Sequence, residues 1–319
     1  MNRAFGKIRR RLQLKSAHAR TRTRAQRIQG PEFHAMAPPV FVVGCQRSGT
    51  SLLRRILDSH PSIACPPESK FILPLEALIH DSQALQALAS MGFAREEVMR
   101  RLRSFVASFF QDYALAKGKE RWADKTPNYV DCLPFLDELF SGEARYIVIV
   151  RHPFDVCLSF EHAAKKSGRP MKAIRSHIAV ADDFRAGACA FWNAQNLKIS
   201  AFVPTVADRV LSVDYELLTS QPEPVLRRIF AFLDAPWSPV VLDYGQLPHD
   251  HGFEDRKIER MPKIVPNFGK FLAWSAGERH RLAAIAREAM DSLGYSPDQA
   301  HRQQAVGDLE RTFIRVDHA

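Results

Sequence analysis

Short apolar runs alternate along the chain with stretches whose apolar residues recur at helical spacing. The runs are rich in β-branched residues, which is typical of buried strands. They lie at residues 40–43, 63–65, 145–150 and 210–213, with an extended segment at 121–127. Helical spacing predicts helices that start at 50 and 155, that span 83–91, 95–116, 129–140 and 178–199, and that run from 224 to 233 and from 275 to 294. Residues 241–274 show neither pattern and are predicted to be irregular.

Strands that alternate with helices predict an α/β fold, in which a parallel sheet is covered by helices on both faces. Ligands of such sheets bind beyond the carboxyl ends of the strands. Three segments with candidate chemistry follow predicted strands, namely 44–51, 151–159 and 214–216. We therefore expect the functional site at that edge of the sheet.

The first of these segments has nearly the spacing of a phosphate-binding loop. Gly44 and Gly49 stand at the two glycine positions, and Ser51 supplies the hydroxyl at the start of the helix. The position of the usual lysine holds Thr50, which argues against hydrolysis of ATP or GTP. Arg47 instead places a cation inside the loop, where it suits an oxyanion. The alternative is an ordinary strand–turn–helix. The layout predicts a P-loop NTPase-like three-layer sandwich with a central parallel sheet flanked by helices.

The positive charge of the chain is concentrated at its start. Residues 1–36 hold ten Lys and Arg residues and one acid, so they carry +9 of the net +10. Such a segment suits nucleic acid or an anionic membrane surface, and a solvated disordered tail is the simpler interpretation. It lacks the apolar core of a secretory signal.

Five cysteines, Cys45, Cys65, Cys132, Cys157 and Cys189, form no C-x-x-C pair. An odd number without metal-ligand spacing predicts reduced, mostly buried thiols in a cytoplasmic protein and no zinc site. No run of about 18 apolar residues occurs, so we expect no membrane span.

The glycine loop, the later Arg151 and Ser159, and Tyr215 resemble the sulfotransferases, which use 3′-phosphoadenosine 5′-phosphosulfate (PAPS) as donor. The resemblance covers about residues 40–295. It is strongest to the tyrosylprotein sulfotransferases, through Arg-Ser-Gly-Thr at 47–50, His-Pro at 60–61, the segment 65–70 and Lys-Ile-Glu-Arg at 257–260. It implies a basic tail over 1–37, a sulfotransferase α/β domain over 38–296 and a polar C-terminal extension over 297–319.

The resemblance also implies which residues hold the donor. The loop residues match contacts to the 5′-phosphosulfate, and Arg151 and Ser159 match contacts to the 3′-phosphate. The implied donor-binding set is Gln46, Arg47, Ser48, Gly49, Thr50, Ser51, Arg151, Ser159, Tyr215, Lys257, Asn267 and Lys270. The alternatives are a structural salt bridge for Arg151, a core hydroxyl for Ser159 and a core aromatic ring for Tyr215.

Three catalytic residues are implied as well. Glu68 matches the general base that deprotonates the acceptor, Lys125 matches the lysine that stabilises charge on the bridging oxygen, and Arg47 assists it. The alternatives are a surface glutamate and an exposed lysine. His60 is another candidate base, but its place at a helix end before Pro61 favours a structural role.

The sequence departs from the tyrosylprotein group near its end. Met261 stands where that group has a serine, and Ala273 precedes Trp274 where that group has a lysine, with Lys270 three positions earlier. These departures weaken the match of 257–274 to donor contacts and of the acceptor to protein tyrosine.

The predicted function is transfer of the sulfuryl group from PAPS to an acceptor hydroxyl, with adenosine 3′,5′-bisphosphate as product and no metal. A carbohydrate, a lipid, a small molecule or a protein tyrosine remains open as acceptor. A P-loop kinase or NTPase is the alternative enzyme, and a binder of nucleic acid or anionic surfaces through residues 1–36 is the alternative of another class. A cytoplasmic protein, peripheral at a membrane through that tail, and a homodimer are both compatible with the sequence.

Overall fold

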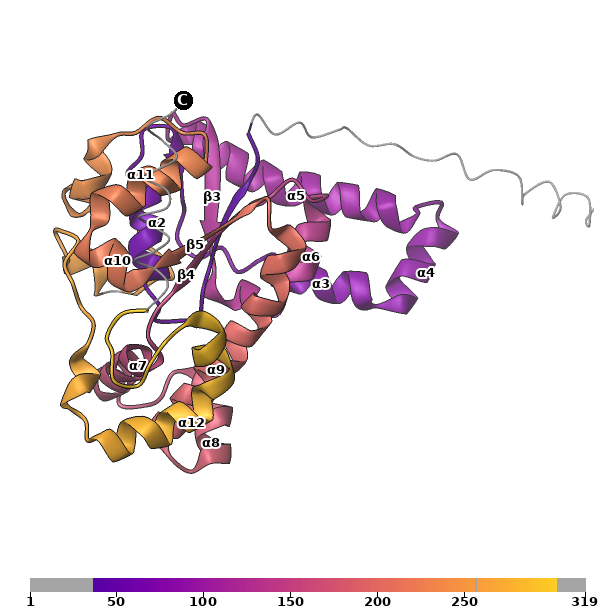
Figure 1. The fold of residues 1–319 in the computed structure, drawn as a ribbon. Coiled ribbons are helices and arrows are strands. Elements are labelled where there is room, and N and C mark those ends of the chain that lie inside the picture. Colours follow the sequence, from indigo (N-terminus) through magenta and orange to yellow (C-terminus); the bar gives the residue numbers. More distant parts are fainter. Residues whose placement is uncertain (1–36, 256, 303–319) are drawn as a thin grey trace, which may run out of the picture.

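The computed structural model describes residues 37–255 and 257–302. They contain a five-stranded sheet in the order β2-β3-β1-β4-β5, and all its pairings are parallel. Its strands are β1 (Val40–Val43), β2 (Ile63–Ala64), β3 (Arg121–Lys125), β4 (Arg145–Val150) and β5 (Val210–Asp214). Because β1 lies between β3 and β4, the glycine turn that follows it emerges at the middle of the carboxyl edge (Figure 1).

Helices cover both faces of this sheet, so the predicted three-layer arrangement is confirmed. Alternate residues of β1 point to opposite faces: Val40 and Val42 pack with α2, α10 and α11, whereas Phe41 and Val43 pack with α5, α6 and the end of α9. The helices are α2 (Thr50–Asp58), α3 (Leu73–His80), α4 (Ser82–Ser90), α5 (Arg95–Ala116), α6 (Leu133–Leu139), α7 (Pro153–Ser167), α8 (Arg175–Ala181), α9 (Phe184–Phe202), α10 (Tyr215–Ser220), α11 (Pro222–Phe232) and α12 (Ala276–Leu293). Short 3₁₀ helices are η1 (Pro127–Asp131), η2 (Lys172–Ile174), η3 (Val203–Val206), η4 (Pro239–Gln246), η5 (Ile258–Arg260) and η6 (Lys270–Ala273).

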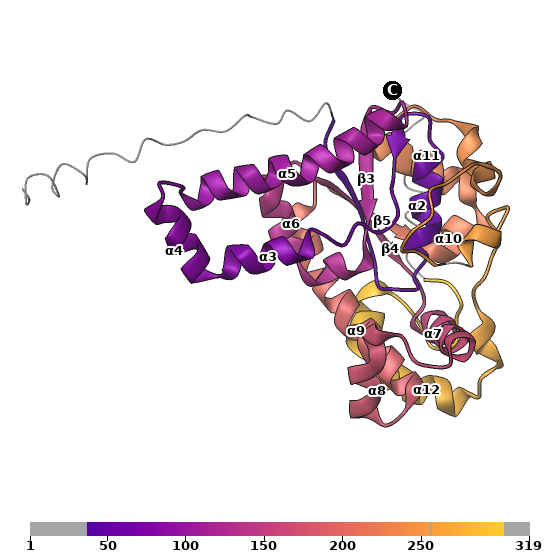
Figure 2. The same ribbon diagram turned by 180° about the vertical axis from the view of Figure 1, so that it is seen from behind.

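Two groups of helices extend beyond the sheet. α7, α8, α9 and α12 form a lobe around a third apolar cluster, which includes Trp192 and Phe271 (Figure 1). On the other side α3, α4 and the first half of α5 project as an arm, which is also visible from behind (Figure 2). Among the described residues, none of the helices has both the length and the apolar character that crossing a bilayer requires.

Two predicted helices were wrong in extent. Residues 129–140 are not one helix: η1 ends at Asp131 and α6 begins at Leu133, because Pro134 fits only the first turn of a helix. Residues 178–199 are divided between α8 and α9. Asp182 adopts a left-handed conformation with a φ of 49°, and Asp183 caps α9 by accepting a hydrogen bond from the amide of Ala186.

Two helices were missed. α3 begins with Leu-Pro-Leu, which reads as a loop, and α10 follows β5 without a turn residue between them. The irregular character of 241–274 is confirmed, since the described part of this segment holds only 3₁₀ turns. This long connection matters below because it crosses the carboxyl edge of the sheet.

Candidate active site

The turn after β1 wraps closely around the N-terminus of α2. Gly49 caps the helix with a φ of 99°, and a Cβ on it would lie 2.4 Å from the ring of Tyr215. At Gly44 a Cβ would lie 2.6 Å from the carbonyl oxygen of Ile149. Both positions therefore require glycine, since the neighbouring β4 and α10 occupy the space of a side chain. The amide groups at the start of α2 face outward from this turn, in the arrangement that binds phosphates.

Arg47 connects the turn with two other segments. Its backbone is left-handed, with a φ of 73°, which directs the side chain across the turn. The Nε atom donates to the hydroxyl of Ser159 on α7 at 3.0 Å, and the guanidinium pairs with Asp255 at 2.8 Å. The segments 44–51 and 151–159 thus meet as expected, whereas the bond of Arg47 to Ser159 and its pairing with Asp255 are contacts that the sequence did not reveal.

Arg151 follows β4 and is held from several sides. Its guanidinium donates to the carbonyl oxygens of Arg47, at 3.0 Å, and of Asn267, at 2.5 Å. It also stacks 4.1 Å from the ring centre of Tyr215, while its buried Nε atom has no partner. The buried Trp192 fixes the backbone by donating to the carbonyl oxygen of Arg151. A guanidinium fixed in this way at the edge of the sheet suits an anionic ligand.

Five cations line one hollow beside the turn, which we call the cationic hollow. They are Arg47, Arg151, Lys165, Lys257 and Lys270, next to the acids Asp155, Glu161 and Asp255, and the larger part of the hollow holds about 360 Å³. Burial and the neighbouring charges of Lys270, Arg151 and Arg47 lower the pKa of Lys257, while Asp255 opposes this shift. Most of the donor-binding residues predicted from the sequence line it, namely Arg47, Gly49, Thr50, Ser51, Arg151, Ser159, Tyr215, Lys257, Asn267 and Lys270.

Glu68 and Lys125 lie on the other side of the turn. Lys125 ends β3 with its side chain fully buried, and its ammonium group donates to Glu68 at 2.8 Å and to the hydroxyl of Ser51 at 3.3 Å. The second oxygen of Glu68 lies 3.2 Å from Lys70. Although the loop itself lacks the usual lysine, Lys125 from the neighbouring strand thus brings an ammonium group to the same hydroxyl.

Glu68 lines a separate cavity of about 310 Å³, which we call the Glu68 hollow. Its wall also includes Gln46, Lys70, Phe253 and Asp255. Arg47, Thr50, Ser51 and Asp255 line this cavity and the cationic hollow alike, so the two spaces meet at the N-terminus of α2. The two spaces are therefore adjacent, with the ion pair of Arg47 and Asp255 in their shared wall.

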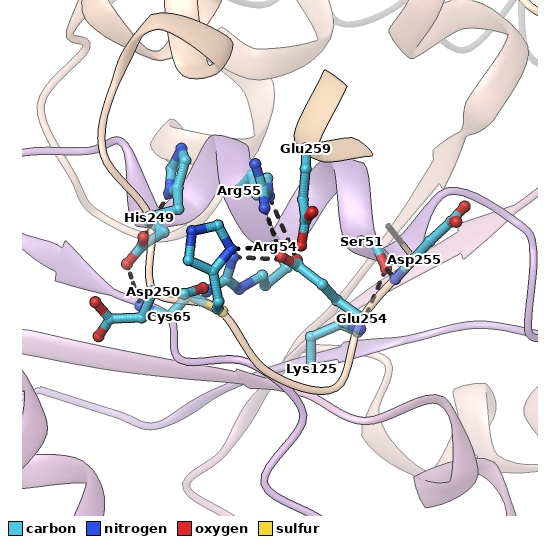
Figure 3. Close-up of polar contacts among 12 residues, drawn as sticks. Ser51, Arg54, Arg55, Cys65, Lys125, His249, Asp250, Glu254, Asp255 and Glu259 are labelled. Carbon is cyan, nitrogen blue, oxygen red and sulfur yellow. Dashed lines mark hydrogen bonds and ion pairs between the residues drawn. The ribbon is translucent and has the colours of Figure 1, made fainter. Parts of the chain in front are cut away.

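Residues 249–255, here called the strap, cross the outer side of α2 (Figure 3). Glu254 is fully buried between Arg54 and Arg55, to which its carboxylate lies at 3.2 and 2.5 Å. His249 pairs with Asp58 at 2.6 Å. Sequence reasoning missed this segment, because Glu254 and its arginine partners on α2 lie about 200 residues apart in the sequence. The strap closes one wall of the Glu68 hollow.

Other residues that the sequence analysis singled out differ in where they lie relative to this centre. His60 is buried, its ring bonds to the carbonyl oxygen of Pro236 and to Ser62, and burial lowers its pKa, which agrees with a structural role. Ser48 is buried, with 1% of its surface exposed. Met261 does line the cationic hollow, whereas Trp274 packs against Phe154 and Arg185 in the lobe.

A glycine turn at the middle of a parallel sheet, with cations around it, is the arrangement in which α/β proteins bind phosphorylated ligands. The model of the sulfotransferase family matches residues 38–239, and the chain belongs to this family. The chain is 26% identical over 297 residues to protein-tyrosine sulfotransferase 1 of Danio rerio, a match that covers 89% of this chain and 79% of that protein.

Two further comparisons agree. The chain is 29% identical over 222 residues to protein-tyrosine sulfotransferase A of Caenorhabditis elegans, covering 67% of this chain but only 54% of that protein, about half its length. A mouse sulfotransferase complexed with PAP has the same fold, with a TM-score of 0.51 and 16% identity over 81% of this chain and 86% of that chain. The predicted enzyme class, its similarity to the tyrosylprotein group and the P-loop NTPase-like fold are confirmed. The roles of single residues stay predictions.

Proposed function

We propose that this chain moves the sulfuryl group of PAPS to a hydroxyl of an acceptor bound in the Glu68 hollow. One observation carries the proposal: Glu68, Lys125 and Ser51 form a hydrogen-bonded chain at the point where the two hollows meet. A base on one side and a cationic site for a nucleotide on the other are what such a transfer needs.

The cationic hollow suits the donor. The turn amides, Arg47 and the hydroxyls of Thr50 and Ser51 are placed for the 5′-phosphosulfate, and Arg151 with Ser159 for the 3′-phosphate. Lys257 and Lys270 add positive charge on the outer wall. Threonine at the position of the usual P-loop lysine is consistent with a donor other than a nucleoside triphosphate.

The chemistry needs one base and one electrostatic stabiliser. Glu68 takes the proton of the acceptor hydroxyl as that oxygen bonds to sulfur, and the bond between sulfur and the bridging phosphate oxygen breaks. The negative charge that develops on the bridging oxygen is stabilised by Lys125 and Arg47, and adenosine 3′,5′-bisphosphate leaves. In the absence of an acceptor, the ammonium of Lys125 holds the carboxyl group of Glu68 in place.

The substitution Glu68→Gln tests the base. The amide keeps the size of the side chain and can accept the hydrogen bond from Lys125, but it cannot take a proton. We expect turnover to fall by about 10²- to 10⁴-fold, whereas adenosine 3′,5′-bisphosphate should still bind with nearly unchanged affinity. Turnover is measured by mass spectrometry with PAPS and a panel of carbohydrate, lipid, phenol and tyrosine-peptide acceptors, and binding by calorimetry.

Glu288→Gln, an exposed change on α12, is the matched control and should leave both quantities unchanged. Loss of turnover and of binding together would make the role of Glu68 structural. If Mg·ATP stabilises the protein against heat and adenosine 3′,5′-bisphosphate does not, the chain is a nucleoside triphosphate enzyme and the proposal is wrong.

A further inference from the structure

Three phenylalanines form an exposed aromatic surface beside the Glu68 hollow, here called the aromatic strip. Phe105 and Phe109 on α5 keep 48% and 54% of their surface exposed. Their ring centres are 5.0 Å apart, and Phe71 packs against them at 6.4 and 5.5 Å. Phe71 packs on the buried Phe110, which stacks on the buried Trp122. The strip therefore packs on the outside of the filled core.

The strip is connected to the Glu68 hollow through Lys70. Lys70, the residue before Phe71, lines that hollow, and its ammonium group lies 4.0 Å from the ring centre of Phe253. Phe253 belongs to the strap and is 67% exposed. Tyr113 follows Phe105 and Phe109 at a spacing of four residues, so it shares their face of α5, and its hydroxyl donates to Asp250 of the strap at 2.9 Å. The strap therefore reaches the same face of α5.

We propose that the aromatic strip binds the alkyl chain of an amphiphilic acceptor whose hydroxyl lies at Glu68. The inference rests on the proposed function and narrows its acceptor to a molecule with a polar head and a long apolar tail. The head occupies the Glu68 hollow near Lys70, and the tail leaves past Phe253 and lies along Phe71, Phe105 and Phe109.

The chemistry of the strip favours an alkyl chain over a peptide. The three rings offer no hydrogen-bond donor or acceptor. A peptide laid on them would lose water from its backbone amides without gaining partners, and that loss is costly. Methylene groups have no such requirement and gain free energy when they leave water. Ordinary protein surfaces expose apolar residues singly, whereas here two half-exposed phenylalanines are in contact, which indicates a binding surface.

Binding of alkyl β-glucosides tests this without need for turnover. Methyl, butyl and octyl β-glucoside are titrated into the full chain, below micelle concentrations and with adenosine 3′,5′-bisphosphate present. We expect octyl β-glucoside to bind about tenfold more tightly than the butyl compound, since four more methylenes become half-buried. The double variant Phe105→Ser, Phe109→Ser should remove this gain and leave bisphosphate binding unchanged.

Two further variants test whether the effect is specific to the aromatic strip. Phe253→Ser changes a ring that is mostly exposed, and it should weaken octyl β-glucoside binding by a smaller factor. Val180→Ser, at a position on α8 that is 89% exposed, is the matched control and should change nothing.

Equal affinity for the butyl and octyl compounds, or no binding of the octyl compound, overturns the inference. A double variant that loses affinity for a tyrosine peptide but not for octyl β-glucoside assigns the strip to peptides and also overturns it. A double variant that changes oligomeric state and keeps its octyl affinity assigns the strip to self-association. Failure of adenosine 3′,5′-bisphosphate to bind the unmodified protein would instead refute the proposed function.

Discussion

Arg47 shows how much the site depends on the backbone of one residue. A left-handed conformation costs a side chain about 1 kcal/mol or more, yet Arg47 holds it, with a φ of 73°. Ser159 and Asp255 fix its guanidinium from two sides, and Arg151 fixes its carbonyl oxygen. The turn is thus held in shape by segments that follow it more than 100 residues later in the sequence. The cation is oriented before any ligand arrives.

Glu216 makes the free energy of unfolding depend on pH. Burial raises its pKa from an ordinary 4.5 to about 8, while its carboxyl group accepts hydrogen bonds from the amide of His152 at 2.8 Å and from the hydroxyl of Tyr295 at 3.2 Å. The folded state therefore binds the proton more tightly than the unfolded chain does. Between pH 4.5 and 8 the contribution of Glu216 to the free energy of unfolding should fall with rising pH, by up to about 1.4 kcal/mol per pH unit.

Glu216→Gln should flatten this slope, because the amide resembles the protonated acid. Urea unfolding at several pH values measures it. Burial raises the pKa of Asp124 to about 6 and lowers the pKa of His152 and of His60 from 6.5, so these groups change stability mainly below pH 7, and the range from pH 7 to 8 isolates Glu216. An unchanged slope in that range would show that Glu216 does not titrate there.

The strap is the element on which the outer wall of the site depends. Glu254 is fully buried between Arg54, which is equally buried, and Arg55. Removing its charge leaves two guanidiniums without a counter-ion in the interior, which typically costs about 3–5 kcal/mol. Glu254→Gln should therefore lower the free energy of unfolding by about 3 kcal/mol and weaken binding of adenosine 3′,5′-bisphosphate, since Asp255 and Arg47 lose their alignment.

Unfolding in urea and calorimetry measure the two effects. Glu259→Gln is the control: this glutamate is partly exposed and pairs with the exposed His251 at 3.4 Å, so the change should stay within about 0.5 kcal/mol. Stability near that of the unmodified protein in Glu254→Gln would mean that the strap is not anchored through this carboxylate.

The contrast between turn and strap explains what the sequence could predict. The strand at 40–43, the two glycines and Arg47 lie within a dozen residues, and strand, turn and helix start each have a local physical cause. Lys125 and Glu68 were identified through the family resemblance, and the structure brings them together. The partners of the strap lie about 200 residues away in the sequence, so no local pattern could predict Glu254 or Asp255 as site residues.

At the scale of the whole molecule, strand order decides where the chemistry gathers. β1 is central, β3 brings Lys125 to one side of the turn, and β4 brings Arg151 to the other. Because all strands are parallel, their carboxyl ends meet at one edge, and the site combines residues from 46 to 270. The predicted meeting of 44–51, 151–159 and 214–216 is present, with Tyr215 against Gly49 and Arg151.

The basic N-terminal segment differs in net charge from the part of the chain that contains the candidate active site. Residues 1–36 lie outside the described part of the structure, and they carry +9 of the net +10, so the rest of the chain is nearly neutral. Each basic residue near an anionic membrane contributes about 1 kcal/mol of attraction. Deleting 1–36 should therefore abolish binding to vesicles that contain phosphatidylserine, whereas kcat/KM for a water-soluble acceptor should stay within about twofold. Vesicle sedimentation at low and high salt measures the first effect.

A variant that keeps residues 1–36, with Arg20, Arg22, Arg24 and Arg27 changed to Gln, separates the effect of charge from the effect of length, because it should lose about half of that attraction and none of the activity. A deletion that leaves vesicle binding intact would place the membrane contact elsewhere, and one that abolishes turnover would make the segment part of the enzyme's catalytic unit.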